Sequence, residues 1–312
     1  MKSFRTLLKS SWIGIRTSAV CALGAILLGT ASAQAITYTS GDIFYVAYQS
    51  PTGPNYIVNL GSKDQLLTAT TTINFPDVLA SDLNGVIGAS ASNIWVGLFA
   101  VRNPTTRDGI LSANGPQNDT DLGTANAIGA ANQIDNFGSG VVNFSLAVPS
   151  GNTHAGKFTS SGSTGSYQST LDAVNKGSLG NNVAWDVETA LSDGAGVRIA
   201  SPVKIPVFSA QRNPFIGLLS RQVIGFFTLN PDGTISYSPD ADGDFIADES
   251  DLCPGVYNFG DNSDTDGDGH APACDCNPSD SSAWSLPGEA TSLVFSTLTG
   301  FGWSAQGWGS TW

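Results

Sequence analysis

Basic residues, histidine and methionine are scarce in this sequence. Its 312 residues include 13 Lys and Arg, 2 His and 1 Met, against 26 Asp and Glu, and the formal net charge is −13 at pH 7. A chain this acidic repels nucleic acids and anionic lipid head groups, and it attracts divalent cations. We therefore expect no nucleic acid among its partners.

Catalytic motifs are also lacking. The sequence has no G-x-S-x-G nucleophile elbow, phosphate-binding loop or dinucleotide fingerprint, and the S-x-x-K match at 201–204 contains a proline that disfavours a helix. His154 lies in a Gly/Ser-rich stretch that is typical of a solvated loop. Asp186 and Glu188, beside Trp185, would share one strand face, either as a carboxylate pair in a sugar site or, as we expect, as a solvated face. We predict no catalytic residues.

Long hydrophobic runs are absent beyond the N-terminal segment. Residues 1–35 combine four basic residues, an apolar run from Thr17 to Thr30 and two A-x-A patterns that end at Ala33 and Ala35. This arrangement is typical of a signal peptide, and it predicts cleavage after Ala35 and a secreted or cell-surface protein. An uncleaved anchor is the alternative, but the run is short for a bilayer span. No later segment reaches 18 uninterrupted apolar residues, so we expect no membrane span in the mature chain.

Cysteine is rare and unevenly placed. Of the four Cys, Cys21 belongs to the signal segment, whereas Cys253, Cys274 and Cys276 lie close together in the sequence. An exported chain meets an oxidising compartment, so we expect a disulfide among these three. Zinc is the alternative partner of such a cluster, but beyond His270 a fourth good ligand is lacking.

Acidic residues, in contrast, are concentrated in one stretch. Twelve of them, and no Lys or Arg, fall between Asp240 and Asp280. Carboxylates at this density repel each other unless cations lie between them. The spacing indicates calcium, because a twelve-residue Ca²⁺ loop takes oxygen ligands from positions 1, 3, 5, 7, 9 and 12, with a backbone carbonyl at position 7. In the first loop these positions are Asp240, Asp242, Asp244, Ile246, Asp248 and Asp251.

A second loop repeats this pattern. Both loops have Gly at position 4, Gly243 and Gly267, which favours tight winding around an ion. The second loop has Pro272 at position 9, so a water or Asp261 must supply that ligand. Its positions 1, 3, 5, 7 and 12 are Asp264, Asp266, Asp268, His270 and Asp275.

Other features separate these loops from an EF-hand. Phe245 stands at position 6 of the first loop, where an EF-hand has Gly, and no amphipathic helices flank either loop. An acidic, disordered linker is the alternative interpretation. The repeated register of the acids argues against it, and calcium is the cofactor that we predict.

The acidic stretch resembles thrombospondin type 3 repeats. Those repeats run D-x-D-G-D-G-x-x-D-x-x-D-x-C-P, then N, then a second D-x-D-G-D-G stretch that ends in C-D. The matching residues here are 240–254, Asn258 and 264–275. The resemblance implies that residues 240–280 have little regular structure, wrap around calcium ions and are held by a disulfide between Cys253 and Cys274. Cys276 is then either free or a competitor for Cys253.

Residues 36–239 are rich in strand-like runs and long enough to bury a core. The turn sequence at 230–233 predicts a hairpin between 226–229 and 234–237. We predict a mainly β domain, an antiparallel sandwich or barrel-like fold with a few short helices, and a long loop at Ser150 to Ser166. The expected strands are 42–48, 56–60, 94–101, 141–148, 203–208 and 222–229, and the expected helices are 77–84, 121–134 and 169–175.

Two further resemblances concern the flanking regions. Residues 41–44, 56–61, 94–97 and 224–230 resemble exported domains of bacterial proteins with PEP-CTERM sorting tails, which implies a Gram-negative surface or matrix protein. Residues 281–312 form a linker and a stretch that resembles the first two strands of a fibronectin type III domain. There, Pro287 would lead the first strand and Trp303 would be the tryptophan of the second.

Two classes of function follow. The first is a secreted or cell-surface calcium-binding structural or adhesive protein, in which the Asp-rich loops fold around calcium as a stiff spacer. Its partners would be calcium ions and an extracellular matrix, glycan or surface protein. The alternative is a secreted hydrolase or glycan-binding module with its site in the β domain.

Overall fold

The computed structural model describes residues 36–103, 108–112, 127–164, 166–171, 188–212, 219–284, 292–297 and 300–304. The prediction of a mainly β, antiparallel fold with a few short helices is confirmed. The signal segment 1–35 with Cys21, and Trp185, Asp186 and Pro287, lie outside the described residues.

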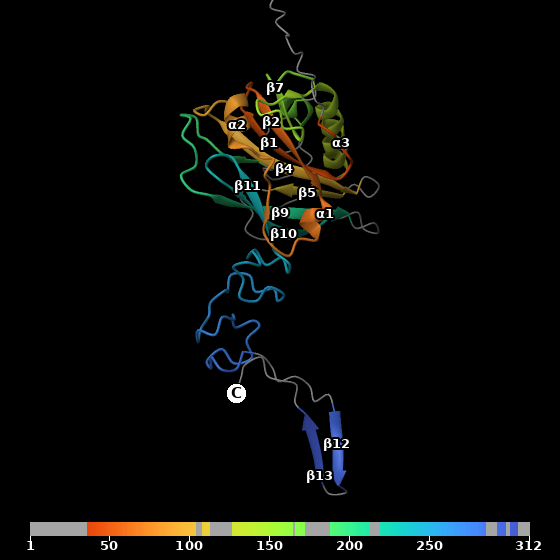
Figure 1. The fold of residues 1–312 in the computed structure, drawn as a ribbon, viewed down its shortest axis with the longest axis vertical. Helices are drawn as coiled ribbons and strands as arrows, with labels where there is room; N and C mark the ends of the chain where they lie inside the picture. Colours follow the sequence, from red (N-terminus) through yellow and green to blue (C-terminus); the bar gives the residue numbers. More distant parts are fainter. Residues whose placement is uncertain are drawn as a thin grey trace, which may run out of the picture. The chain divides into compact units, whose positions relative to one another are not determined.

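One large sheet forms the centre of the fold (Figure 1). Its strand order is β3-β11-β10-β9-β5-β4-β1-β2-β7-β6, and β8 pairs with β4 beside β5. The strands are β1 Asp42–Gln49, β2 Asn55–Ser62, β3 Ile73–Asn74, β4 Ile94–Asn103, β5 Asp108–Ser112, β6 Leu146–Ala147, β7 Ala155–Phe158, β8 Glu188–Ala190, β9 Val203–Arg212, β10 Leu219–Leu229 and β11 Ile235–Pro239. The described helices are α1 Asp64–Leu67, α2 Ala80–Val86, α3 Ala127–Phe144 and α4 Tyr167–Leu171.

Apolar residues cover both faces of this sheet. Side chains alternate along a strand, so neighbours on β1 point to opposite faces. Phe44, Val46 and Tyr48 belong to a first core, whereas Ile43, Tyr45 and Ala47 belong to a second core. The central strands are therefore buried on both sides, and the first core is completed by helix residues.

The sheet curls so that distant strands share the second core. Phe227 on β10 lies in the same buried cluster as Tyr45 on β1, although β9, β5 and β4 separate the two strands in the sheet. The Tyr45 hydroxyl donates a hydrogen bond of 2.8 Å to the carbonyl of Gly233, in the turn after β10. This contact joins the two halves of the sheet, and the curled sheet corresponds to the barrel-like alternative.

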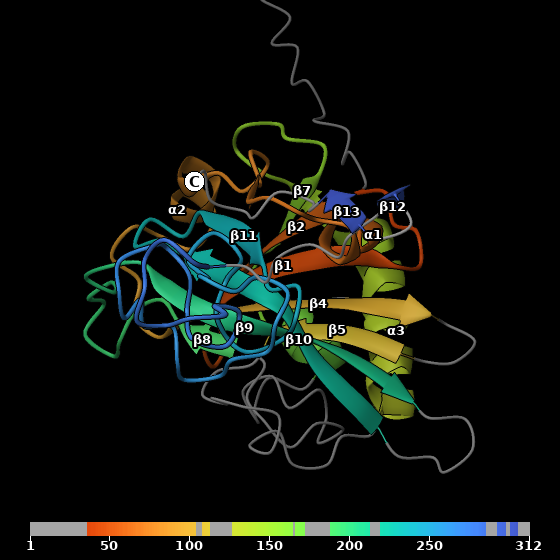
Figure 2. The same cartoon turned by 90° about the horizontal axis from the view of Figure 1, so that it is seen from below.

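Helix α3 corrects one prediction. It packs against β4, β5 and β9 (Figure 2). It includes residues 141–144, which the sequence predicts to be part of a strand over 141–148. Ile134, Phe137 and Val141 are all buried in the first core. Their spacing of three and four residues is helical, and burial on that face overrides the strand preference of Val141 and Val142. Only Leu146–Ala147 remains as a strand.

Of the other local predictions, some are confirmed and some are shifted or partly wrong. The hairpin is confirmed, with Leu229 opposite Ile235. The predicted helix at 77–84 begins later, at Ala80. The predicted helix at 169–175 overlaps α4, Tyr167–Leu171, and residues 172–175 lie outside the described residues. The predicted loop at 150–166 is partly wrong, because β7 pairs with β2 within it. The C-terminal stretch contains a separate two-stranded sheet of β12 Ser292–Thr297 and β13 Gly300–Ser304.

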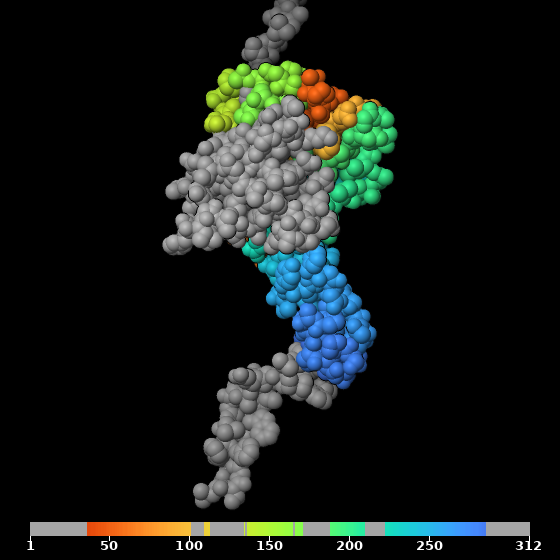
Figure 3. Space-filling model, turned by 180° about the vertical axis from the view of Figure 1, so that it is seen from behind, coloured from red at the N-terminus to blue at the C-terminus, as the bar shows by residue number. Residues whose placement is uncertain are grey.

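Residues 240–284 contain neither helix nor strand (Figure 1). Figure 3 shows their atoms packed closely along the segment. Among the described residues, no helix is both long enough and apolar enough to cross a membrane.

Candidate metal centre

The first acidic loop winds around its own carboxylates. Asp240 accepts hydrogen bonds from the backbone N–H groups of Gly243 at 2.8 Å and Phe245 at 3.0 Å. Asp244 accepts one from Ile246 at 2.8 Å. One carboxylate oxygen each from Asp240, Asp242 and Asp244 lie within 4.8 Å of one another. The backbone thus turns three carboxylates toward one point.

The second loop has the same geometry. Asp264 accepts hydrogen bonds from the N–H groups of Gly267 at 2.7 Å and Gly269 at 2.8 Å, and Asp268 accepts one from His270 at 2.9 Å. Carboxylate oxygens of Asp264, Asp266 and Asp268 again lie within 4.8 Å of one another. In both loops, therefore, position 1 accepts from positions 4 and 6, and position 5 accepts from position 7.

The backbone conformation at position 6 is shared as well. Gly269 has φ 92°, and Phe245, the residue that departs from the EF-hand pattern, has φ 74°. Non-glycine residues seldom adopt this left-handed conformation. Phe245 nevertheless keeps the turn, so its side chain does not alter how the first loop winds.

Several side-chain oxygens between residues 242 and 268 have no hydrogen-bond partner among the described residues. Asp251 is 9 % exposed and Asn258 is 7 % exposed, yet Asp251 Oδ2 and Asn258 Oδ1 accept no hydrogen bond from the described residues. The same holds for buried oxygens of three loop acids, namely Asp242 Oδ2, Asp266 Oδ1, Asp266 Oδ2 and Asp268 Oδ2. A buried oxygen without a donor is costly, so these six oxygens fit a bound cation.

The electrostatics of the loops point the same way. Burial raises the pKa of Asp240 to about 7, against two backbone hydrogen bonds that lower it. Burial, with the neighbouring charge of Asp244, also raises the pKa of Asp242. In the second loop, backbone N–H donors, Gly269 foremost, lower the pKa of Asp264. A cation would stabilise the ionised form of every one of these groups.

The remaining predicted ligands lie at the ends of the loops. Asp248 Oδ1 accepts a hydrogen bond from the Ala241 N–H at 2.8 Å. Asp251 Oδ1 accepts one from Cys253, and Asp275 Oδ1 accepts one from Asn277. Asp251 and Asp275 therefore also fix the turns that follow them, whereas Asp248 closes the first loop back onto its start.

Asn258 is a candidate ligand that the spacing of the acids does not indicate. It lies outside both twelve-residue loops, but its backbone N–H donates to Asp244 Oδ2 at 3.2 Å. Its own Oδ1 is among the six oxygens without a donor. The only signal in the sequence was its match to the asparagine of the thrombospondin type 3 pattern.

A disulfide joins the two loops. Cys253 and Cys274 are bonded, with their Cα atoms 5.7 Å apart, and this is the pairing that the repeat resemblance implies. Cys276 is exposed and free, and its thiol donates to the Ala283 carbonyl. The bonded pair is unavailable to zinc, and the ring of His270 stacks on Trp284 with centroids 4.6 Å apart.

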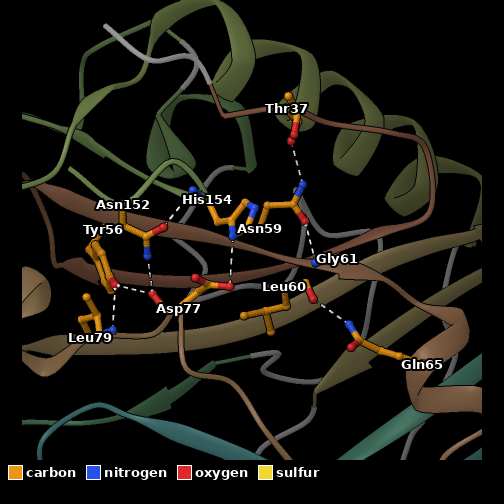
Figure 4. A network of polar contacts seen from close by, with 10 residues as sticks. All are labelled: Thr37, Tyr56, Asn59, Leu60, Gly61, Gln65, Asp77, Leu79, Asn152 and His154. Carbon is orange, nitrogen blue, oxygen red and sulfur yellow. Dashed lines mark hydrogen bonds and ion pairs between the residues drawn. The ribbon is translucent and has the colours of Figure 1, made fainter. Parts of the chain in front are cut away.

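The β domain has a network of polar contacts of its own (Figure 4). Asp77 Oδ2 lies 3.0 Å from His154 Nδ1, and Asn152 Nδ2 donates to the Asp77 carbonyl at 2.9 Å. A hollow of about 200 Å³ beside this pair is lined by Thr37, Asp42, Asn59, Leu60, Gly61, Asp77 and His154. His154 is 56 % exposed, as expected for a loop residue, but it is paired with Asp77.

Glu188 corrects the expectation of a solvated strand face. It is fully buried on β8, next to Gly97 of β4. Its two carboxylate oxygens accept hydrogen bonds from the hydroxyls of Tyr48, at 2.9 Å, and Tyr167. Burial, with the Glu188 charge, raises the pKa of Tyr167 well above its ordinary value. Glu188 thus anchors β1 and α4 to β8.

Comparisons with protein families, with curated proteins and with solved structures found no match for this chain. The function proposed below therefore depends on the geometry of the loops and on the sequence.

Proposed function

We propose that residues 240–280 bind two or more calcium ions, and that the protein is a secreted or cell-surface structural or adhesive protein. One observation supports this most directly. Six buried oxygens that accept no hydrogen bond from the described part of the chain are grouped in a segment that has no Lys or Arg. A cation is the partner that satisfies such oxygens and also offsets the repulsion among the acids.

The donor set favours calcium over other metals. Every candidate ligand is a carboxylate, amide or carbonyl oxygen, which suits hard cations and not zinc or copper. Calcium takes six to eight oxygens in flexible geometry, whereas magnesium demands a strict octahedron and keeps most of its waters. Loops that each bring several oxygens together fit calcium better.

Calorimetric titration of Ca²⁺ into the mature protein tests the proposal. Saturable binding of at least two ions is expected, with Kd on the order of 10⁻⁴ to 10⁻³ M. The double variant Asp242→Asn/Asp266→Asn should lose most of this binding, because it removes one charged ligand from each loop. The matched control is Asp64→Asn/Asp232→Asn, which removes two charges outside residues 240–280. Equal binding by both double variants would refute the proposal.

The extracellular location rests on the signal-like N-terminal segment and on the disulfide. Disulfides persist in oxidising compartments, so a bonded Cys253–Cys274 pair is consistent with export. Mass spectrometry of the mature protein should find an N-terminus at Ile36. Recovery of the intact chain, still beginning at Met1, from a membrane fraction would contradict it.

The hollow beside Asp77 and His154 favours a second candidate, a glycan-binding module or hydrolase. Two carboxylates, an amide and an imidazole line it, and such groups bind sugar hydroxyls. A glycan array probed with residues 36–312 is the test. The control is Asp193, whose carboxylate accepts hydrogen bonds from Ala195 and Val197 and does not line the hollow. Glycan binding that disappears in Asp77→Asn, but persists in Asp193→Asn, would place the site in the hollow. If no glycan binds, the second candidate is refuted and the calcium-binding structural role is the one that remains.

A further inference from the structure

Phe245 connects the first acidic loop to the β domain. Its ring lies against Phe208 of β9, with centroids 5.9 Å apart, and it packs on the first core. It also meets Phe259 edge-on at 5.7 Å. A residue at position 6 of the loop, between ligand positions 5 and 7, is thus in contact with the core.

Glu249 makes a second connection. It is not at a ligand position, and its carboxylate accepts hydrogen bonds from Thr72 Oγ1 at 2.6 Å and Ser238 Oγ at 3.1 Å. Lys204 of β9 lies 3.7 Å from the same carboxylate. Glu249 therefore ties the end of the first loop to β9, β11 and the segment before β3.

The backbone makes a third connection. The Asp240 N–H donates to the Ile224 carbonyl of β10 at 3.1 Å, and the Asp248 N–H donates to the Pro239 carbonyl at 2.9 Å. The first ligand of the loop is thus held by β10, next to the point where β10 pairs with the end of β11. Its position depends on the pairing of β10 with β11.

The second loop differs. The hydrogen bonds described for the carboxylates of Asp264 and Asp268 come from residues 267–270, within the same loop. The disulfide attaches it to Cys253, which lies after the first loop. Its connection to the β domain therefore runs through the first loop.

We infer that the ion in the first loop is a structural part of the β domain and stabilises strands β9 and β10, whereas an ion in the second loop does not. This inference rests on the proposed calcium binding. Opening of β9 and β10 would release Phe245 and Asp240, and with them the ion. Calcium would therefore oppose that opening by mass action.

Hydrogen exchange of β9 and β10 amides at different free calcium concentrations is the test, with peptides that cover 203–208 and 223–229. If opening releases one ion, exchange slows about tenfold for each tenfold rise in calcium above Kd. Asp266→Asn should bind fewer ions but keep this dependence. Asp242→Asn should lose it. This pair of variants changes no core residue, so both are expected to fold.

Phe245→Gly tests the connection itself. Glycine at position 6 favours the left-handed turn, so calorimetry should still show an ion in the first loop. Exchange in β9 and β10 should then respond to calcium less steeply than in the wild type.

The outcomes separate the two proposals. Calcium binding by calorimetry together with calcium-independent exchange of β9 and β10 in the wild type would overturn this inference and leave the proposed function intact. So would a dependence that is lost in Asp266→Asn and kept in Asp242→Asn. No binding by calorimetry would refute the proposed function, and this inference with it.

Discussion

The ring of Phe245 lies against the ring of Phe208, although Phe245 stands in the loop position that Gly269 takes in the second loop. The two residues share a left-handed backbone, with φ 74° and 92°. The departure of Phe245 from the EF-hand pattern therefore does not weaken the winding of the loop. It gives the first loop a side chain that packs on the core, which the second loop lacks.

Gly225 should be sensitive to substitution. It has φ 153°, it lies at a bulge in the pairing of β10 with β9, and a Cβ at this position would lie 2.3 Å from the carbonyl oxygen of Ser238 on β11. Gly225→Ala should lower the free energy of unfolding by roughly 2 to 4 kcal/mol and weaken calcium binding, because Asp240 is held beside this bulge. Chemical denaturation and calorimetry measure the two effects.

Gly162→Ala is the matched control. Gly162 is exposed, and a Cβ there would meet no atom within 4 Å. The free energy of unfolding of Gly162→Ala should stay within about 0.5 kcal/mol of the wild-type value. If both variants lose the same stability, the close contact at Gly225 is not the cause.

The disulfide should contribute to calcium affinity. It links residues 21 apart, and loss of such a bridge costs about 3 kcal/mol in the chain-entropy model. Cys253→Ser/Cys274→Ser should therefore weaken calcium binding by about a hundredfold, because calcium alone must then order the segment. Cys276→Ser should bind as the wild type does, since Cys276 is exposed and unbonded. Equal affinities in all three proteins would contradict this prediction.

The pH dependence of the free energy of unfolding should differ between the calcium-free and the calcium-bound protein because of Asp240. Without calcium, burial raises the pKa of Asp240 to about 7, so the folded state holds a proton that the unfolded state releases near pH 4. Stability from this group is therefore present below pH 4 and is lost as the pH rises to 7. Bound calcium replaces the proton and removes this loss.

The increase in melting temperature on adding calcium should thus be larger at pH 8 than at pH 5. Scanning calorimetry of calcium-loaded and calcium-free protein at both pH values measures it. In the calcium-free protein, Asp240→Asn should reduce the loss of stability that occurs as the pH rises from 4 to 7. An equal increase at both pH values would show that Asp240 does not contribute in this way.

Much of the sheet was predictable from local pattern. The runs at 42–48, 56–60, 94–101, 203–208 and 222–229 all fall within strands. The acid spacing also predicted that positions 1, 3 and 5 of each loop come together, because position 1 accepts N–H groups only a few residues away. That the acids at positions 9 and 12 join them stays a prediction. Such local contacts are encoded in a short stretch of sequence.

Contacts between distant residues were not predictable. The hydrogen-bond partners of Glu188 are Tyr48 and Tyr167, which are 140 and 21 residues away. The sequence around Glu188 therefore does not predict that it is buried. Val141 was assigned to a strand because β-branched residues favour strands, but packing of α3 decided its conformation. Phe245 looked like a departure from the loop pattern because Phe208 is 37 residues away in the sequence.

Anomalous diffraction from crystals grown with calcium tests the central claim most directly. The account predicts at least two calcium peaks in residues 240–280, one at 2.3 to 2.6 Å from the oxygens of Asp240, Asp242 or Asp244 and one from those of Asp264, Asp266 or Asp268. Ordered loops without a peak near either triplet, in crystals held at about ten times the highest expected Kd, would contradict it.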